Sequence, residues 1–345
     1  MSRADFRLSL VVPVYNEEES IDAFISAIDT ELAPLKDQLE IVFVNDGSRD
    51  RTREVVEQAI ARDPRVTLVN LARNFGKEAA MTAGLHQAKG DAIVPMDVDL
   101  QDPPSLILEF VKLWQTGDYD TVYGIRVDRS ADTPMKRLTA GGFYRFFNAL
   151  STSTKLPENA GDFRLIDRKV VEALKQLPER NRFMKGLFAW AGFRAVGVPY
   201  ERPARHAGET KFNYWKLWNF ALDGLMSFSS WPLRVWSYVG VGVSFIAFLY
   251  ILKIITQVLF FGIDVPGYAS LMSVMLFLGG IQLLSLGIIG EYIGRMFVEV
   301  KQRPVYLIEG VYGQYARQDA GKQPDAAATQ SEKAQDADKQ EPASQ

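Results

Sequence analysis

Two long stretches without a charged residue constrain this sequence more than any other feature. Val235 to Leu252 and Val265 to Gly290 contain no Asp, Glu, Lys or Arg. Each is near or above the roughly 18 to 20 residues with which an α-helix crosses a bilayer. The sequence therefore predicts two transmembrane helices, at residues 234–261 and 268–293.

The charges beside these stretches predict their orientation. The connecting loop, Gly262 to Gly267, holds Asp264 but no basic residue. Basic residues flank the opposite ends, namely Arg234, Arg295, Lys301 and Arg303. Because short segments rich in Lys and Arg stay in the cytoplasm, both termini are expected there.

The segments beside the predicted spans have their own compositions. Residues 211–233 begin with interleaved basic and aromatic side chains and are expected to form an amphipathic juxtamembrane segment at headgroup depth. The alternative is that these aromatic side chains belong to the core of the preceding domain. Residues 294–316 are expected to form a second, cytoplasmic juxtamembrane segment. Residues 317–345 contain no aromatic residue and are expected to be disordered, since they cannot bury a core.

The first part of the chain alternates short apolar runs with stretches of helical periodicity. The runs are expected to be strands: Leu8–Val14, Leu39–Asn45, Val66–Leu71, Ala92–Asp97, Tyr119–Ile125 and a short one at Phe163–Ile166. Helices are expected between them at 21–32, Arg51–Arg62, Lys77–Ala88 and Pro103–Trp114. This alternation predicts an α/β domain over residues 1–210, with a doubly wound, mostly parallel sheet. The sequence contains neither a G-x-G-x-x-G nor a Walker A pattern, which disfavours dinucleotide-binding and P-loop versions of such a sheet.

Composition excludes several classes of protein. The chain has no cysteine and only two histidines, which excludes disulfide frameworks, thiolate catalysis and the usual zinc sites. Its formal net charge of -3 gives no basic excess, so nucleic acid is not expected as a partner.

Acidic residues cluster in the segment DVDLQDPP, which follows the apolar run 92–96. Asp97 and Asp99 therefore fall where a strand leaves the sheet, which is where open α/β sheets bind ligands. With Gln101 they offer the hard oxygen ligands that suit Mg²⁺ or Mn²⁺ carrying a diphosphate. The alternative is helix capping, with Asp102 as N-cap and Pro103 at the first helical position. Capping leaves Asp97 and Asp99 as neighbouring like charges, which is costly unless a cation is close by.

Several motifs, in order and spacing, resemble glycosyltransferase family 2: VVPVYNEEES, VNDGSRDRT, ARNFGKEAAMTAGLHQAKGD and MDVDLQDPP. With GDFRLIDR, RHAGETKF and the two C-terminal apolar stretches, the chain resembles the bacterial polyprenyl-phosphate glycosyltransferases of the bactoprenol glucosyltransferase group. Dolichol-phosphate mannose synthase is a more distant relative. The resemblance covers Leu8 to Leu307 and implies a GT-A-like nucleotide-sugar fold.

The resemblance implies roles on the donor side. The residues implied to bind the nucleotide sugar are Pro13, Tyr15, Glu17, Asp46, Asp97, Arg205 and Lys211. Asp99 and Gln101 are implied to bind the metal, Mg²⁺ or Mn²⁺. Positions 98 and 102 are expected to be dispensable, because related sequences often carry alanine and histidine there. Asn45 receives no role, since many relatives have two acids where this chain has Asn45-Asp46.

The resemblance also implies an acceptor site for a polyprenyl monophosphate. Arg126, Lys136 and Arg137 match positions near that phosphate. Asp162, in GDFRLIDR, matches an acid that orients or deprotonates the acceptor, so Asp162 and Asp97 are the expected catalytic residues. The alternative for each basic residue is a solvated surface group.

The implied activity is inverting transfer of a sugar from a UDP-sugar to polyprenyl (undecaprenyl) phosphate, at the cytoplasmic face of the bacterial inner membrane. Glucose is expected, because the form of GDFRLIDR is similar to that of the glucosyl group. Other donors remain open, namely UDP-N-acetylhexosamine, a modified arabinose and GDP-mannose, as do other lipid acceptors. A non-catalytic membrane scaffold is the contrasting class. Homo-oligomers through the membrane helices and a role in modifying a cell-envelope glycan are further expectations.

Overall fold

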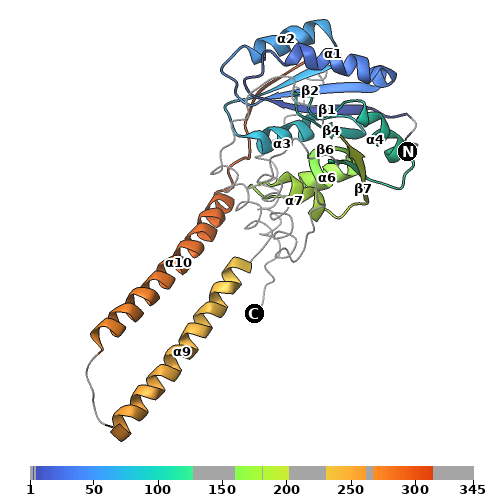
Figure 1. Cartoon of the computed structure of the whole chain (residues 1–345). Helices are drawn as coiled ribbons and strands as arrows, with labels where there is room; N and C mark the ends of the chain where they lie inside the picture. Colours follow the sequence, from blue (N-terminus) through green and yellow to red (C-terminus); the bar gives the residue numbers. More distant parts are fainter. Residues whose placement is uncertain are drawn as a thin grey trace, which may run out of the picture.

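In the computed structural model, residues 3, 5–126, 160–180, 182–201, 231–261 and 267–313 are described. They form an α/β domain from which two long helices project (Figure 1). The strands are β1 Leu8–Val14, β2 Leu39–Asn45, β3 Val66–Leu71, β4 Ala92–Pro95, β5 Thr121–Arg126, β6 Ala160–Asp167, β7 Ala195–Tyr200 and β8 Ile308–Tyr312. The helices are α1 Ile21–Glu31, α2 Thr52–Arg62, α3 Lys77–Gln87, α4 Leu106–Gln115, α6 Arg168–Lys175, α7 Met184–Trp190, α9 Trp231–Phe261 and α10 Tyr268–Val300, with a 3₁₀ turn at Ala33–Gln38.

The strands form one eight-stranded sheet in the order β7-β5-β6-β4-β1-β2-β3-β8. The predicted α/β class is confirmed, and the central pairs β1–β4, β1–β2 and β2–β3 are parallel as expected. However, β6 lies antiparallel between β4 and β5, and β8 is antiparallel to β3. The sheet is therefore mixed, and the prediction of a doubly wound, mostly parallel sheet holds for its central part.

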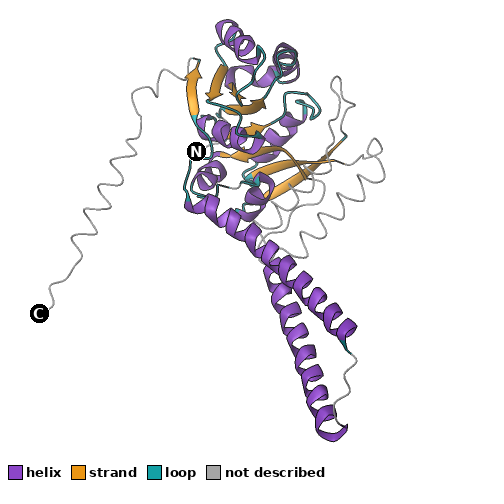
Figure 2. Ribbon diagram, turned by 90° about the vertical axis from the view of Figure 1, so that its left-hand side faces the viewer, coloured by secondary structure: helices purple, strands orange, loops and turns teal. Residues whose placement is uncertain are grey.

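Helices cover both faces of this sheet (Figure 2). One buried cluster joins α1, α2 and α4 to alternate residues of β1, such as Leu10 and Val12. The other joins α3, α6 and α7 to the residues that point the opposite way, such as Val11 and Val42. Strands buried on both faces read as continuous apolar runs, which is why the bounds of β1, β2 and β3 could be predicted to the residue.

Helix α3 packs unusually close to the sheet. A Cβ at Gly84 would lie 2.3 Å from Cγ1 of Val11, so the helix can approach β1 this closely only with glycine there. This helix begins at Lys77, beside the acids that follow β4, and ends at Gln87.

The start of α4 differs from the prediction. The helix begins at Leu106 with Ser105 as N-cap, rather than at Pro103. The carbonyl of Pro103 accepts a turn hydrogen bond from the N–H of Leu106 at 3.1 Å. Ser105, not Asp102, is the N-cap, and the buried Asp102 accepts a hydrogen bond from Tyr200, so the capping explanation for Asp102 is wrong.

The two long helices occupy the predicted ranges, with α9 over 231–261 and α10 over 268–300. In the described part of the chain, one apolar stretch is long enough to cross a membrane, Phe277–Val300 of α10, and none of it is buried. The apolar stretch Tyr238–Tyr250 of α9 is shorter. Of the other predicted segments, residues 262–266 of the loop, residues 211–230 of the amphipathic segment and the tail at 317–345 lie outside the described residues.

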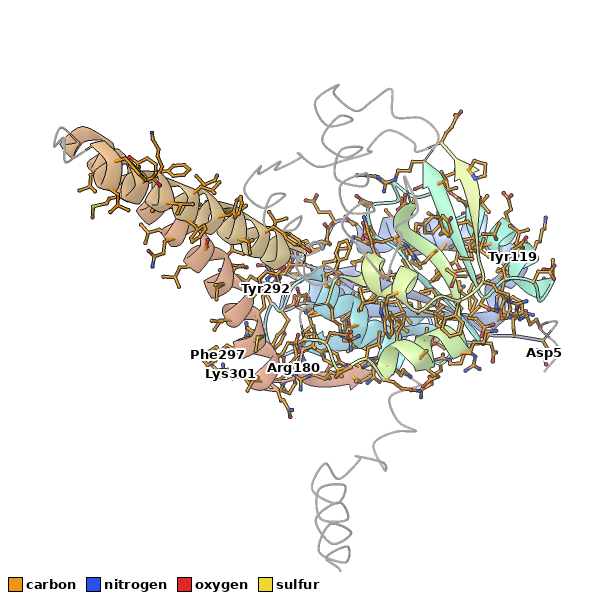
Figure 3. The ribbon with its side chains drawn as sticks, turned by 90° about the horizontal axis from the view of Figure 1, so that it is seen from below. Asp5, Tyr119, Arg180, Tyr292, Phe297 and Lys301 are labelled. Carbon is orange, nitrogen blue, oxygen red and sulfur yellow. The ribbon has the colours of Figure 1, made fainter. Side chains whose placement is uncertain are left out.

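Beyond α10 the chain returns to the domain. Residues 294–316 were expected to be a juxtamembrane segment, but they include β8, which completes one edge of the sheet. The junction is also held by Glu299, whose Oε1 accepts a hydrogen bond from the N–H of Arg180 at 2.9 Å. Figure 3 shows Arg180 beside the end of α10 that carries Phe297 and Lys301. Nearby, Nδ1 of His86 lies 2.7 Å from the hydroxyl of Tyr306.

Candidate active site

A cavity of about 350 Å³ opens at the carboxyl ends of β1, β2 and β4. Its lining includes most of the residues predicted for the donor side: Pro13, Tyr15, Glu17, Asp46, Asp97 and Asp99. They come from three strand ends because parallel strands finish at the same edge of a sheet. A larger depression of about 810 Å³ lies at the amino ends of the strands, but it is lined by ion pairs such as Arg65–Asp63 and contains none of the predicted site residues.

The carboxylate of Asp46 is committed to the backbone of a neighbouring loop. Its two oxygens accept hydrogen bonds from the N–H groups of Phe75, at 2.7 Å, and Gly76, at 2.9 Å. Burial raises the pKa of Asp46, although these backbone donors act in the opposite direction. The adjacent Gly47 has a φ of +66°, and a Cβ there would lie 2.5 Å from the backbone of Arg73. The turn after β2 and the loop before α3 therefore form one wall of the cavity.

Lys77 connects two acids that come from different strands. Its Nζ lies 2.6 Å from Oδ1 of Asp97, which follows β4, and 4.0 Å from Oδ2 of Asp162, in β6. Sequence reasoning missed Lys77, although it belongs to the motif ARNFGKEAAMTAGLHQAKGD. A lysine at the first position of a predicted helix close to the cavity edge was the signal available.

Several cations surround Asp162. Nζ of Lys185, from α7, lies 3.9 Å from its Oδ1, and Lys77 approaches from the other side. Burial alone would raise the pKa of Asp162, but Lys185, Lys77, Arg164 and Arg126 outweigh burial, and the pKa is lowered. Asp162 is thus an ionised carboxylate with four cationic side chains around it. Such a surrounding suits a phosphate dianion next to the carboxylate better than it suits a strong base.

A second acid faces this cluster from α3. Burial, and then the charge of Asp162, raise the pKa of Glu78 to about 7. Its Oε2 accepts a hydrogen bond from the N–H of Met184 at 3.3 Å, which ties the start of α3 to the start of α7. The two helices that carry Lys77 and Lys185 are therefore held together at the site.

Arg126 is held in place by its neighbours. Its Nε donates to the hydroxyl of Tyr200 at 3.3 Å, and that hydroxyl donates to Oδ1 of Asp102 at 2.5 Å. Burial, and then Asp102, raise the pKa of Tyr200 to about 12, so its hydroxyl keeps its proton. A Cβ at Gly124 would lie 2.6 Å from the ring of Tyr200, so the ring lies across β5 only because glycine is there. Position 102 is expected to be dispensable from the sequence, but here Asp102 contacts Arg126 both through Tyr200 and directly, with its Oδ1 3.9 Å from Nη2 of Arg126.

The loop after β4 is folded tightly around the predicted metal ligands. Leu100 has a φ of +54°, which a leucine rarely adopts and which costs on the order of 1 kcal/mol or more. This turn lets Oδ1 of Asp99 accept a hydrogen bond from the N–H of Gln101 at 3.2 Å. Nε2 of the buried Gln101 has no hydrogen-bond partner among the described residues.

Asp99 and Gln101 suit a cation that is also coordinated by the diphosphate of a substrate. Within the described ranges, no group of three or more His, Asp or Glu side chains is arranged to hold a metal alone. One carboxylate and one amide oxygen leave most positions of an octahedral shell to water and to the oxygens of a diphosphate, as Mg²⁺ prefers. The remaining predicted site residues, Lys136, Arg137, Arg205 and Lys211, lie outside the described residues.

Comparison with known proteins identifies the family. The model of glycosyl transferase family 2 matches residues 9–175, and the GtrB C-terminal hairpin matches residues 231–296. A prophage-derived bactoprenol glucosyl transferase of Shigella flexneri is 51% identical over 305 residues, which cover 88% of this chain and 97% of that protein. The chain therefore belongs to glycosyl transferase family 2, and it is a glycosyltransferase.

Other relatives agree over the same length. The prophage bactoprenol glucosyl transferase homolog of Escherichia coli strain K12 is 50% identical over 306 residues, covering 88% of this chain and 99% of that protein. The uncharacterized glycosyltransferase sll0501 of Synechocystis is 52% identical over 306 residues, covering 89% of this chain and 96% of that protein. The similarity spans both the sheet domain and the helical hairpin of this chain.

Proposed function

We propose that this protein transfers glucose from a uridine diphosphate donor to polyprenyl phosphate, with inversion at the anomeric carbon. The observation that carries the proposal is the position of Lys77, 2.6 Å from Asp97 and 4.0 Å from Asp162. The acid assigned to the donor and the acid assigned to the acceptor thus lie within reach of one ammonium group. Two substrates bound this close together can react directly, because binding them side by side removes most of the entropic cost of their encounter.

The names of the relatives support both substrates. The matches to proteins called bactoprenol glucosyl transferase cover 97% to 99% of their length, so they include the hairpin as well as the sheet domain. Glucose as the sugar and a polyprenyl phosphate as the acceptor are the simplest inference from this similarity.

The proposed reaction is a single displacement. An oxygen of the acceptor phosphate attacks the anomeric carbon while the bond from that carbon to the UDP oxygen breaks, and its electron pair leaves with UDP. A phosphate monoester has a second pKa of about 6 and is mostly dianionic at neutral pH, so the attack needs no strong base. Asp162, with its lowered pKa, is suited to orient the acceptor. Lys185 and Arg126 supply the positive charge that binds the acceptor phosphate.

A divalent cation, Mg²⁺ or Mn²⁺, fits the loop after β4. Asp99 and Gln101 would hold it, and Asp97 would contact the nucleotide and the metal's surrounding shell. When bound there, the cation would neutralise the negative charge that grows on the leaving diphosphate. Arg205 and Lys211 are proposed to assist from the segment outside the described residues.

The hairpin is proposed to keep the active site at the membrane surface. In this proposal α9 and α10 both span the inner membrane, and the catalytic domain and both termini are cytoplasmic. The long uncharged stretch within each helix and the basic residues at their domain ends support this arrangement. Confinement to the bilayer raises the effective concentration of a lipid-linked acceptor.

One incubation series tests the chemistry. Membranes containing the protein receive polyprenyl phosphate and one labelled donor at a time: UDP-glucose, UDP-N-acetylhexosamine, a UDP-linked modified arabinose or GDP-mannose. Label from UDP-glucose should enter the lipid phase, and the Asp99→Asn variant should abolish this transfer. The anomeric configuration of the product, read by NMR, tests inversion. Transfer from another donor would show that the sugar is not glucose. Label in diacylglycerol would show that the acceptor is not polyprenyl phosphate. No transfer from any donor would favour the non-catalytic scaffold.

A labelling experiment tests the topology. Because the chain contains no cysteine, single cysteines can be placed at Ser270 and Ser331. In intact spheroplasts, an impermeant thiol reagent should label the Ser270→Cys protein and leave the Ser331→Cys protein unlabelled. The opposite pattern would reverse the proposed orientation, and labelling of neither site or of both would contradict a two-span hairpin.

A further inference from the structure

The strand that follows the membrane hairpin is part of the catalytic sheet. β8 pairs antiparallel with β3, with Asn70 opposite Gly310 and Leu71 opposite Ile308. The N–H of Ala72 also donates to the carbonyl of Leu307 at 2.9 Å. The end of α10 is thus joined to the sheet by a ladder of backbone hydrogen bonds, on the side that leads to the nucleotide cavity.

The side chain of Glu309, on β8, reaches into this edge. Its Oε2 lies 2.7 Å from Nδ2 of Asn70, and its Oε1 lies 3.3 Å from Nη1 of Arg53. Arg53 in turn donates to the hydroxyl of Tyr312 at 2.9 Å and to Oε1 of Glu57 at 2.8 Å. Glu57 therefore shares the arginine but makes no contact with Asn70 in the described structure.

From Asn70 the hydrogen bonds continue towards the cavity. Asn45, at the end of β2, donates from Nδ2 to Oδ1 of Asn70 at 2.6 Å. Both amides are buried, with 2% and 3% of their surface exposed, so water does not compete for the hydrogen bond between them, whereas the side chain of Glu309 is 51% exposed. Oδ1 of Asn45 accepts from the N–H of Ser48 at 3.1 Å. Asn45 thereby holds the turn that contains Asp46, which lines the cavity.

The same turn is joined to the loop after β1. Oγ of Ser48 accepts a hydrogen bond from the N–H of Asn16 at 3.0 Å, and Oδ1 of Asn16 accepts from the N–H of Arg49 at 2.9 Å. Asn16 has a φ of 55° and lies between Tyr15 and Glu17, both of which line the cavity. The two loops expected to enclose the nucleoside are therefore fixed to each other and, through Asn45, to Asn70.

The two ends of this chain of hydrogen bonds, the N–H of Ser48 and the carboxylate of Glu309, determine which amide group donates and which accepts. A backbone N–H can only donate, so Ser48 must face the amide oxygen of Asn45. An ionised carboxylate can only accept, so Glu309 must face the amide nitrogen of Asn70. Between these ends, Asn45 has to donate and Asn70 has to accept. An acid at position 45 would break this order, because its carboxylate would face the oxygen of Asn70.

We propose that Glu309 is a positioning residue for the donor site: through Asn70 and Asn45 it sets the turn 46–48 and so couples the end of the membrane hairpin to nucleotide binding. This inference deepens the proposed function and rests on it for the identity of the donor. It gives Asn45 the role that the sequence did not provide, and it gives β8 a purpose beyond closing the edge of the sheet.

The first test compares Glu309→Ala with Glu57→Ala in the full chain, reconstituted in vesicles. Both variants remove a carboxylate partner of Arg53, but only Glu309→Ala removes the acceptor of Asn70. Loss of one hydrogen bond in the chain should raise the KM for the nucleotide sugar by about three- to tenfold, with kcat and the KM for the acceptor nearly unchanged. Amides of residues 45–49 should also exchange hydrogen faster in Glu309→Ala, and not in Glu57→Ala.

The second test uses the direction of the hydrogen bonds. Asn45→Asp alone should raise the donor KM, because Asn70 must turn its amide to serve the new carboxylate and then presents its oxygen to Glu309. Glu309→Gln should restore the donor KM in the Asn45→Asp background, since glutamine can donate to that oxygen. In the parental background Glu309→Gln should change it by less than about twofold, because glutamine can also accept from Asn70.

Each outcome decides between positioning and simple stability. A fall in Tm without a change in donor KM, equal effects of Glu309→Ala and Glu57→Ala, or additive effects of Asn45→Asp and Glu309→Gln would overturn the proposal. Hydrogen exchange needs no donor. If the protein uses none of the donors in the panel, the proposed function fails, but faster exchange in Glu309→Ala and its reversal in the double variant still test the coupling.

Discussion

Nζ of Lys77 lies 2.6 Å from Oδ1 of Asp97, so a residue of α3 neutralises one of the two acids that follow β4. Like charges at Asp97 and Asp99 are costly to hold close together unless a cation is nearby. The protein itself supplies one such cation, and a metal with its diphosphate would supply the other at Asp99. Both Asp97 and Asp162 raise the pKa of Lys77 although its burial acts in the opposite direction, so the ammonium keeps its proton.

Replacing Lys77 should therefore impair turnover more than folding. Lys77→Met leaves Asp97 and Asp162 without their shared cation and should lower kcat on the order of 10²-fold, as the removal of one electrostatic contact to a transition state usually does. Lys112→Met, on the exposed side of α4, serves as the matched control. Near-parental kcat in the purified Lys77→Met protein would contradict a role at the reacting centre.

Asp99→Asn should abolish transfer while leaving the protein folded. The substitution removes a charge from the proposed metal site at the end of a strand and leaves the core volume unchanged, and the expected loss in turnover is on the order of 10² or more. Asp118→Asn, at an exposed position far from the cavity, is the control. Metal-stimulated activity near the parental level in Asp99→Asn would remove Asp99 from the metal site.

Tyr200→Phe should weaken acceptor binding. It removes the hydroxyl that joins Asp102 to Arg126, so the guanidinium of Arg126 loses one of its two links to Asp102 and keeps only the ion pair at 3.9 Å. The KM for polyprenyl phosphate should rise by about three- to tenfold, with a smaller change in the KM for the donor. Tyr119→Phe, at the far end of the domain from α10 (Figure 3), should leave both constants unchanged. An effect confined to the donor KM would mean that Arg126 contacts the donor and not the acceptor.

The joint between hairpin and domain should weaken in acid. Burial, and then Arg182 and Lys175, lower the pKa of His86 from 6.5 to about 4, with Glu172 acting in the opposite direction. Between these values the unfolded chain binds a proton that the folded protein does not. This part of the stability is therefore complete above pH 6.5 and is lost as the pH falls towards 4, on the order of 3 kcal/mol in all.

A variant separates this effect from other acid-sensitive groups. His86→Gln, which keeps a polar partner for Tyr306, should lose less Tm than the parent between pH 7 and about pH 4.5. Equal losses of Tm in the two proteins would show that His86 does not titrate in this window.

The place of Asp97 and Asp99 at the edge of the sheet could be predicted from the sequence, because they follow an apolar strand. The other donor-side residues are implied only by the resemblance to glycosyltransferase family 2. Asp46 follows β2 and Asp97 follows β4, and parallel strands bring such positions to one edge whatever fills the rest of the fold. The bounds of β1, β2 and β3 could be predicted to the residue, because a strand buried on both faces is a continuous apolar run. The two long helices could be predicted because each contains a long uncharged stretch.

The sequence could not predict which segments, far apart in the chain, contact one another in the fold. Periodicity identifies a strand but not its neighbour, so the antiparallel insertion of β6 and the pairing of β8 with β3 emerged only from the tertiary structure. Asp102 looked like a helix cap because the chain around it reads as one, and only the packing of β7 brought Tyr200 to it. Lys77 with Asp162, and Glu309 with Asn70, are likewise pairs made by sheet order. The sequence by itself determined the strands β1, β2 and β3, the acids that follow β4 and the two long helices, because these follow from local burial and charge. The tertiary structure decided the contacts between acids, cations and amides, because these depend on the pairing of strands that lie far apart in the chain.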